Sequence, residues 1–201
     1  MTYIIIAFTS IVSFIALQNR VIFEKYLFNA YATIHHKQIY RIISHAFLHA
    51  DFNHLLFNML TLFFFGVYVE SVFKMYFGNL GISYYMLLYF LAIIFSTLPA
   101  IIKHRNNQFY NAVGASGAVS AVLFSYILFD PFGKIIIFFI PIGIPAFIFG
   151  PAYLLYSAYM GKKGIDNIGH DAHFWGAIFG FIFPLLLDYK LFFHFLNQLI
   201  N

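Results

Sequence analysis

The chain has 201 residues, of which 62% are apolar, 22% are aromatic and 9% are charged, with a formal net charge of +4. A soluble domain carries roughly a quarter charged residues, so this composition indicates an integral membrane protein and excludes a soluble globular one. The small basic excess indicates lipid headgroups rather than nucleic acid, and the absence of cysteine excludes disulfides, thiolate metal sites and a cysteine nucleophile.

The charged residues are confined to narrow zones, and the stretches between them define the predicted membrane crossings. A helix needs about 20 apolar residues to cross the hydrocarbon core. The charge-free runs cover residues 1–19, 52–69, 75–102, 106–129, 135–161 and 172–187. We therefore predict an all-α, polytopic membrane protein with six transmembrane helices, folded as a single domain over residues 1–201.

The first predicted helix, residues 3–18, lacks a basic start and a small-residue cleavage pattern, so it is interpreted as a membrane helix and not as a signal peptide. Residues 20–52 form a long connection rich in aromatic and basic side chains, which is typical of short amphipathic helices at the membrane interface. The remaining helices are predicted at residues 53–69, 82–102, 114–129, 145–160 and 171–187. The apolar tail after them is too short for a seventh crossing.

Polar residues cluster near the starts of three predicted helices. His54 and Asn58 begin the second helix, Ser116 begins the fourth and His173 begins the sixth. Polar groups in or near hydrocarbon are costly, so they indicate function by default. Because all three helices are even-numbered, they enter the membrane from one face, and each cluster lies within about two turns of its helix start. We expect these side chains to share one side and one depth.

Small residues predict which helices touch. Gly117 and Ala121 form a small-xxx-small pair on the fourth helix, and Gly176 and Gly180 form one on the sixth. Such pairs allow two backbones to approach closely in lipid. Taken alone, the run AVGASGAVSA favours helix packing over catalysis. If the two helices pack through these glycines, however, the serine and the histidine come within reach of each other.

Several other polar residues have a structural interpretation. His45 and His49 lie in or beside the interfacial connection, where they are expected to hydrogen-bond to backbone or water. Ser120 lies within a helix and is expected to bond to a carbonyl one turn earlier. Glu70 ends the second helix as a structural or solvated acid. Asp171 lies two residues before the histidine of the sixth helix and points away from it, so a Ser-His-Asp triad is not predicted.

With these residues in view, the chain resembles the rhomboid family of intramembrane serine proteases over essentially its whole length. The family motifs G-x-S-G, A-H-x-x-G and H-x-x-x-N appear here as Gly114-Ala115-Ser116-Gly117, Ala172-His173-Phe174-Trp175-Gly176 and His54-Leu55-Leu56-Phe57-Asn58. The upstream H-x-x-x-H pattern appears as His45 and His49, with Arg41 four residues earlier.

This resemblance implies a six-helix rhomboid-like bundle and a serine endopeptidase that needs no cofactor and no metal. Ser116 would be the nucleophile, and His173 would be the base that later protonates the leaving amine. The oxyanion would be held by His54, the Asn58 amide and the Ser116 backbone N–H. The residues expected to support the site are Gly114, Gly117, Gly176, Gly180, Arg41, His45 and His49. The implied partners are the lipid bilayer and membrane-anchored protein substrates, cleaved in or near their transmembrane segment.

The sequence departs from the family at one position beside the histidine. Bacterial members often carry an aromatic residue four positions after the serine, stacked against the catalytic histidine, and here that residue is Ser120. The expected replacement is the ring of Phe174 or Trp175. Segment 135–145 and the helix after it resemble the region through which the family admits substrates laterally.

The orientation in the membrane is predicted differently by the family and by the charges. The family places the first loop and the active site outside the cytoplasm, here of a bacterial cell membrane, whereas the positive-inside rule places that loop in the cytoplasm. The basic residues on the side of the first loop are Arg20, Lys25, Lys37, Arg41, Lys103, Arg105, Lys162 and Lys163, against Lys74, Lys134 and Lys190 on the other. We favour the family orientation. The positive-inside rule has exceptions, and a connection rich in aromatic residues is expected to lie in the membrane interface rather than extend freely into solvent.

Two other function classes remain open from the sequence. The segments HAFLH and HDAH resemble the histidine boxes of membrane desaturases and hydroxylases, in which imidazoles bind iron. That interpretation lacks a further double-histidine box and leaves GASG unexplained. A non-catalytic chaperone or transporter on the same fold is the second alternative, and it predicts that Ser116 and His173 are dispensable.

Overall fold

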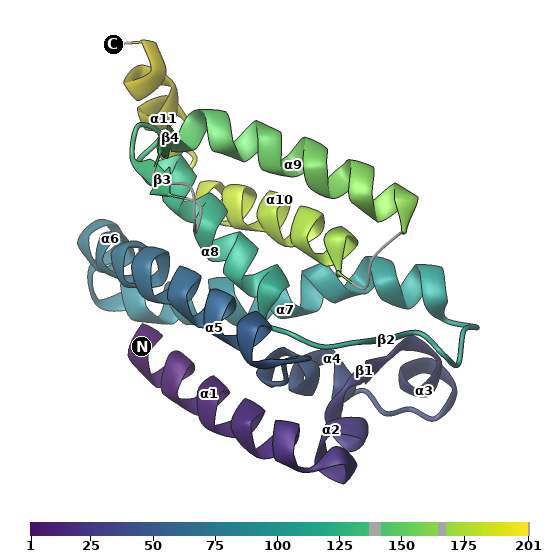
Figure 1. Ribbon diagram of the computed structural model, residues 1–201. Helices are drawn as coiled ribbons and strands as arrows, with labels where there is room; N and C mark the ends of the chain where they lie inside the picture. The colour runs from purple at the N-terminus through teal and green to yellow at the C-terminus, as the bar shows by residue number, and fades with distance from the viewer. Residues whose placement is uncertain (137–141, 165–167, 201) are drawn as a thin grey trace.

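The computed structural model describes residues 1–136, 142–164 and 168–200, which form an all-α bundle with two very short strand pairs (Figure 1). The longer helices are α1 (Thr2–Gln18), α5 (Phe52–Thr61), α6 (Val67–Phe77), α7 (Gly81–His104), α8 (Ser116–Phe129), α9 (Ala146–Lys163), α10 (His170–Leu187) and α11 (Lys190–Ile200). The connection between α1 and α5 carries α2 (Arg20–Tyr26), α3 (Ala30–His35), α4 (Arg41–Ser44) and a 3-10 turn at His45–Phe47.

Helix α8 runs through the middle of the bundle, as Figure 1 shows, and every residue from Gly117 to Phe129 is buried. A helix that is apolar on all sides is stable only when other helices surround it. Its neighbours include α10, where the Ser125 hydroxyl donates to the Gly180 carbonyl at 2.7 Å. On another side, the ring of Phe129 lies 5.8 Å from the ring of Phe73 on α6.

Helices α5 and α6 form one continuous rod joined by a π-helical turn at Leu62–Gly66. The rod extends to Phe77, beyond residue 69, where the sequence places the end of the second helix. Beyond residue 69 the helix buries Val72 and Phe73, and Glu70 and Lys74, which interrupt the apolar run, pair with each other at 2.7 Å. The rod ends at Gly78, whose φ of +54° few residues other than glycine adopt.

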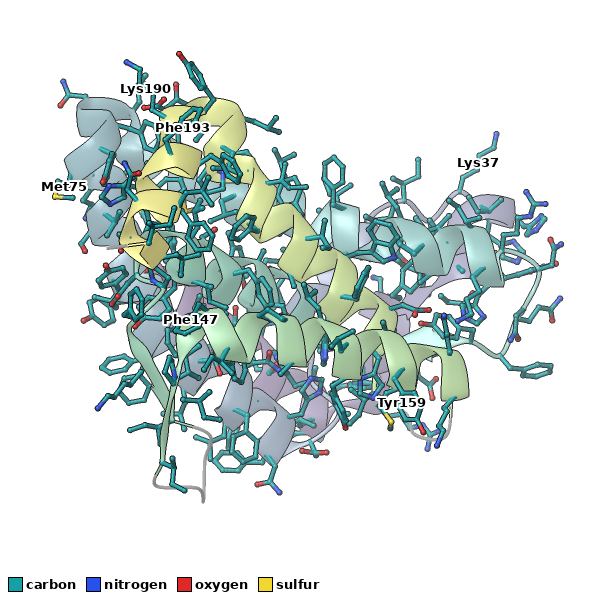
Figure 2. The ribbon with its side chains drawn as sticks, turned by 90° about the horizontal axis from the view of Figure 1, so that it is seen from above. Lys37, Met75, Phe147, Tyr159, Lys190 and Phe193 are labelled. Atoms are coloured by element: carbon teal, nitrogen blue, oxygen red, sulfur yellow. The ribbon has the colours of Figure 1, made fainter. Side chains whose placement is uncertain are left out.

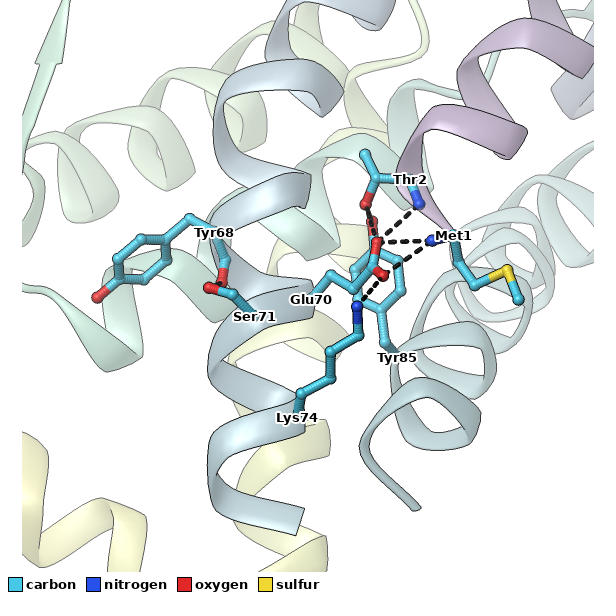
Figure 3. A network of polar contacts seen from close by, with 7 residues as sticks. All are labelled: Met1, Thr2, Tyr68, Glu70, Ser71, Lys74 and Tyr85. Carbon is cyan, nitrogen blue, oxygen red and sulfur yellow. Dashed lines mark hydrogen bonds and ion pairs between the residues drawn. The ribbon is translucent and has the colours of Figure 1, made fainter. Parts of the chain in front are cut away.

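Glu70 is also the acceptor of a polar network that joins the start of α1 to α6 (Figure 3). Its carboxylate accepts from the Thr2 backbone N–H at 2.8 Å, from the Thr2 hydroxyl at 2.9 Å and from the Met1 amino group at 2.8 Å. The Thr2 hydroxyl lies 2.8 Å from the hydroxyl of Tyr85 on α7. Glu70 is therefore a structural acid that links three helices.

The outer face of α1 indicates an apolar solvent. Its buried residues are Thr2, Ile5, Thr9, Ser13 and Ala16, and four of these five are small or polar. Its exposed large apolar residues are Tyr3, Ile4, Phe8, Ile11, Phe14, Ile15 and Leu17. A helix in water has the opposite arrangement, with its large apolar residues inside. This arrangement fits a helix that faces lipid tails.

Two described segments, Phe52–His104 and His170–Leu187, are long and apolar enough to cross a membrane, and α1 and α8 are shorter apolar helices. The first segment has 53 residues, but it turns back at Gly78. The rings of Phe77 and Tyr84 lie 5.3 Å apart across this turn. The all-α class is confirmed, and the count of six crossings stays a prediction.

The connection between α1 and α5 is folded onto the segment that precedes α8. Strand β1 (Phe28–Asn29) pairs antiparallel with β2 (Asn111–Ala112). Arg41 fixes the connection internally, because its guanidinium donates to the Glu24 carbonyl at 3.0 Å and to the Leu27 carbonyl at 2.5 Å. Through the β1–β2 pairing, the connection therefore holds the segment that leads to Ser116 in place.

The segment that joins α8 to α9 is described in part. Strand β3 (Lys134–Ile136) pairs antiparallel with β4 (Gly143–Pro145), which leads directly into α9. Residues 137–141 of the predicted entry region, segment 135–145, lie outside the described residues. Helix α9 lies on the outside of the bundle over α10, and it presents much of its length to the surroundings (Figure 2).

Candidate active site

The chain just before Ser116 is held by backbone hydrogen bonds and by a glycine. The Gly114 N–H donates to the His45 carbonyl at 3.0 Å, and the Ala115 N–H donates to Nε2 of His49 at 3.5 Å. Gly114 has a φ of +120°, a backbone conformation that glycine adopts and other residues rarely do. The start of α8 is thus fixed by contacts made one and two residues earlier.

His49 lies at the centre of this arrangement and is fully buried. Because its Nε2 accepts from Ala115, its Nδ1 carries the proton and donates to the Ser13 hydroxyl on α1 at 2.7 Å. Ser13 in turn donates to the Phe47 carbonyl at 2.9 Å. Burial lowers the pKa of His49 to about 3, so the ring is neutral in the folded chain.

His45 is a second buried histidine with a structural environment. Its Nδ1 donates to the Arg41 carbonyl at 2.9 Å, and its Nε2 lies 3.5 Å from the Thr97 hydroxyl on α7. Burial lowers its pKa to about 4. His45 and His49 therefore both bond to backbone, as expected from the sequence, and both support the approach to α8.

His54, on the first turn of α5, faces this same segment. Its ring occupies the space that a side chain on Gly114 would need, with Nε2 2.8 Å from the position of a Cβ there. The Ala50 N–H donates to Nδ1 of His54 at 3.5 Å, which leaves the proton on Nε2. A hydrogen-bond donor from α5 thus lies beside the backbone that leads into Ser116.

Asn58 lies one turn further along α5 and is buried. Its side-chain amide donates one N–H to the His54 carbonyl at 2.9 Å. A primary amide has a second N–H to offer. Among the hydrogen bonds of the described residues, none joins Asn58 to Ser116.

Helices α8 and α10 touch backbone to backbone through their small residues. A Cβ on Gly176 would collide with the backbone of Gly117, and a Cβ on Gly180 would collide with the backbone of Ala121. The contact continues toward the helix starts, where the Ala172 carbonyl oxygen lies 3.4 Å from the place of a Cβ on Gly117. Gly117 adjoins Ser116 and Ala172 adjoins His173, so the two predicted site residues occupy adjacent starts of packed helices.

Ser116 is the first residue of α8 and is half-buried, as is His173 on the first turn of α10. The N–H groups of a helix's first turn have no carbonyl acceptor within the helix. In α8 these N–H groups begin at Ser116. No hydrogen bond between Ser116 and His173 is present in residues 1–136, 142–164 and 168–200.

Ser120 has a different partner from the one expected. Its hydroxyl lies 2.7 Å from the hydroxyl of Tyr153 on α9, rather than bonding to a carbonyl one turn earlier. The Tyr153 ring is nearly parallel to the His173 ring, at 23° with 6.3 Å between centroids. Phe174 and Trp175, the rings expected beside His173, contact each other instead, and Trp175 is 47% exposed. Among the described residues, the ring of Tyr153 on α9 therefore stacks nearly parallel to His173, in the role expected of Phe174 or Trp175.

Sequence reasoning missed Tyr153, because nothing in the sequence indicates which of its 15 tyrosines approaches α10. The weak signal that exists is the spacing of Tyr153, Tyr156 and Tyr159 three residues apart, which puts tyrosines along one side of a helix. Tyr156 meets the His170 ring at 5.6 Å, and His170 meets His173 at 5.9 Å. Asp171 points elsewhere and pairs with Lys103 on α7 at 2.9 Å.

The histidine-box interpretation can be tested against the same contacts. A histidine that binds iron must direct a ring nitrogen lone pair at the metal. The ring nitrogens of His49 face Ser13 and Ala115, and Nδ1 of His45 faces the Arg41 carbonyl. In the part of the chain that the structure describes, no three His, Cys, Asp or Glu side chains are arranged to hold a metal ion.

Comparisons with known proteins agree with the motifs. Residues 36–190 match the family model described as Rhomboid domain. The chain is 32% identical to RHOMBOID-like protein 12, mitochondrial, from Arabidopsis thaliana, over 158 residues that cover 70% of this chain and 44% of the relative. The chain thus spans less than half the length of that relative. The name of the relative places that protein in mitochondria, so this similarity does not support the prediction of a bacterial cell membrane.

Proposed function

The chain belongs to the rhomboid family, and on that premise we propose that it is an intramembrane serine protease that uses Ser116 and His173. Members of this family are integral membrane proteins. The observation that carries the proposal is the backbone contact between Gly117 and Gly176, because it brings the starts of α8 and α10 together at these two residues.

In the proposed reaction, His173 accepts the proton of the Ser116 hydroxyl as the oxygen attacks the carbonyl carbon of a peptide bond. A serine hydroxyl is a weak nucleophile until a base takes its proton, and a neutral imidazole does this near pH 7. The protonated His173 then gives the proton to the leaving amine. Water, activated by the same histidine, hydrolyses the acyl-enzyme and releases the second product.

The negative charge on the carbonyl oxygen would be stabilised from two sides. On one side are the N–H groups of the first turn of α8, beginning with Ser116. On the other side is Nε2–H of His54, which lies beside Gly114, together with the second N–H of the Asn58 amide. Preorganised donors of this kind are often the largest single contribution to acyl-transfer catalysis.

Hydrolysis requires water, which the hydrocarbon core excludes. All of the proposed groups lie within about two turns of a helix start, so the site would open to the aqueous phase on one face of the membrane. The proposed substrates are membrane-anchored proteins whose helix unwinds near its end, where residues with low helix propensity expose the peptide bond. We place this face outside the cytoplasm.

Cleavage of a membrane-anchored reporter by the purified chain in proteoliposomes tests this proposal. The wild-type chain should cut the reporter, while Ser116→Ala and His173→Ala should abolish cleavage without unfolding the chain. The matched controls are Ser71→Ala, an exposed serine on α6, and His36→Ala, an exposed histidine in the connection. Both controls should cleave at the wild-type rate.

A non-catalytic membrane chaperone on the same fold is the other candidate. It predicts that the reporter stays intact with the wild-type chain and that Ser116→Ala leaves the biological function unchanged. Stoichiometric iron in the purified protein, together with an active Ser116→Ala variant, would instead favour an oxygenase.

A further inference from the structure

Tyr153 lies where three helices meet beside the proposed dyad. It is on α9, its hydroxyl bonds to Ser120 on α8, and its ring faces His173 on α10. The ring is also contacted by Phe124 on α8 and by Phe149 on α9, each with a centroid 5.6 Å away. Ser120 is 4% exposed and Tyr153 is half-buried, so the hydrogen bond between the two hydroxyls is partly shielded from solvent.

The register of α8 explains why Ser120 can place a ring beside the dyad. Ser120 follows Ser116 by four residues, and residues four apart lie on one face of a helix. The Ser120 hydroxyl therefore lies about one turn from the proposed nucleophile, on the side that faces His173 and α9. A hydrogen bond at this point fixes the position of the Tyr153 hydroxyl, and the packing of Phe124 and Phe149 against the ring limits its rotation.

We propose that Tyr153, anchored by Ser120, is the positioning residue that holds the His173 imidazole in its reactive orientation. This inference rests on the proposed function, in which His173 is the base. A nearly parallel aromatic neighbour limits the rotation of the imidazole about its side-chain bonds.

A purely structural role for Tyr153 predicts different behaviour. In that case the ring would only pack α9 against α8, and its removal would lower thermal stability and activity together. A positioning role predicts a lower kcat with an unchanged KM and an unchanged population of folded protein. The two roles are therefore separable by steady-state kinetics.

The test compares four variants in the reporter cleavage assay, with unfolding temperature measured for each. Tyr153→Ala removes the ring and should lower kcat about tenfold, the size of effect that a single aromatic pair supports, with KM unchanged. Tyr153→Phe keeps the ring and should retain most of the activity. Ser120→Ala should resemble Tyr153→Phe, and the double variant Ser120→Ala with Tyr153→Phe should be no worse than either single one.

A relocated ring provides a rescue experiment. Because the two hydroxyls are 2.7 Å apart, a tyrosine at position 120 can fill the space that Tyr153→Ala vacates. The double variant Ser120→Tyr with Tyr153→Ala should therefore recover kcat relative to Tyr153→Ala alone. The control is Tyr159→Ala, whose ring is 56% exposed near the other end of α9 (Figure 2) and which should leave kcat unchanged.

Two failures are distinguishable. If Ser116→Ala is inactive while Tyr153→Ala keeps the wild-type kcat, or loses kcat and unfolding temperature together with no recovery on relocating the ring, the positioning role is wrong and the protease assignment stands. If Ser116→Ala cleaves as well as the wild type, the proposed function is wrong, and this inference is overturned with it.

Discussion

His49 acts through a hydrogen bond that a protonated ring could not make. Nε2 of His49 accepts the Ala115 N–H, and an imidazolium has no acceptor to offer. The rings of His45 and His49 are both buried, which lowers their pKa values below the ordinary value of 6.5, to about 4 for His45 and about 3 for His49. At neutral pH the site is thus supported by two neutral rings.

This protonation behaviour predicts a stability that depends on pH. Below pH 6.5 the unfolded chain protonates both rings, whereas the folded chain does so only near pH 4 and below. The unfolded state then binds more protons. Each unit by which the pH is lowered should therefore reduce the free energy of unfolding by up to about 1.4 kcal/mol for each histidine. Above pH 6.5 these two rings should not make the free energy of unfolding depend on pH.

Thermal unfolding in detergent micelles at pH 7.5, 6.5, 5.5 and 4.5 measures this effect. Replacement of His49 by Gln should reduce the slope below pH 6.5, because the contribution of that buried ring is gone. Replacement of the exposed His36 by Gln is the control and should keep the full slope. A wild-type unfolding temperature that stays level from pH 6.5 to 4.5 would contradict the assignment of two buried neutral rings.

His54 is the residue for which an oxyanion role makes the sharpest prediction. Its Nε2–H lies beside Gly114, at the side of the loop that leads to Ser116. His54→Ala should lower kcat by about 10²- to 10³-fold, as expected for the loss of one preorganised donor, and should leave KM nearly unchanged. Steady-state cleavage of the reporter measures both constants. A variant with the wild-type kcat would show that His54 does not stabilise the oxyanion.

At the scale of the helices, the proposed site depends on the distance between α8 and α10. Gly176 and Gly180 meet the backbone of α8, which cannot move aside as a flexible side chain can. Larger residues at these positions must separate the helices and draw the two proposed catalytic residues apart.

Gly180→Ala tests this dependence. Its new Cβ would overlap the Ala121 backbone, so the free energy of unfolding should fall by about 1–3 kcal/mol, as for an overpacked core, and cleavage should fall with it. The control is Gly150→Ala on α9, where the nearest atom is the mobile end of Ile127 at 3.3 Å. That variant should stay within about 1 kcal/mol of the wild type, since alanine also favours the helix. Equal effects of the two substitutions would contradict the backbone contact.

The elements that could be predicted from sequence are those fixed by local patterns. Apolar runs bounded by charges indicate the helices, and the GASG and AHFWG segments indicate which helix starts carry the serine and the histidine. The extension of the second helix to Phe77 was not predicted, because Glu70 and Lys74 interrupt the apolar run, although a Glu and a Lys four residues apart are a local pattern that favours a continued helix. The role of Ser120 could not be predicted, because its partner, Tyr153, is 33 residues away on a different helix.

At the scale of the whole molecule, the connection between α1 and α5 and the turn at Gly78 lie at opposite ends of the α5–α6 rod. In Figure 2, Lys37 of the connection and Met75 near the turn lie on opposite sides of the molecule. If α5–α6 crosses the membrane, these residues face different compartments. The family orientation puts Lys37 outside the cytoplasm, whereas the distribution of basic residues puts it inside.

Because the chain contains no cysteine, single cysteines can report this orientation. Lys37→Cys and Met75→Cys both replace exposed side chains. In intact bacterial cells expressing the chain, a membrane-impermeant maleimide should label the first variant, and the second only after permeabilisation. The cysteine-free wild type is the control for background labelling. The reverse pattern, or a reporter fused after Asn201 that registers outside, would refute the proposed orientation.

The central claim is that Ser116 is a nucleophile activated within the folded bundle, and reaction with a serine-directed fluorophosphonate measures it most directly. The wild-type chain in detergent should become labelled at one site that mass spectrometry assigns to Ser116. His173→Ala should be labelled far more slowly, and Ser116→Ala should not be labelled at all. A folded wild-type chain that takes up no label, or a Ser116→Ala variant that is labelled as fast as the wild type, would contradict the account.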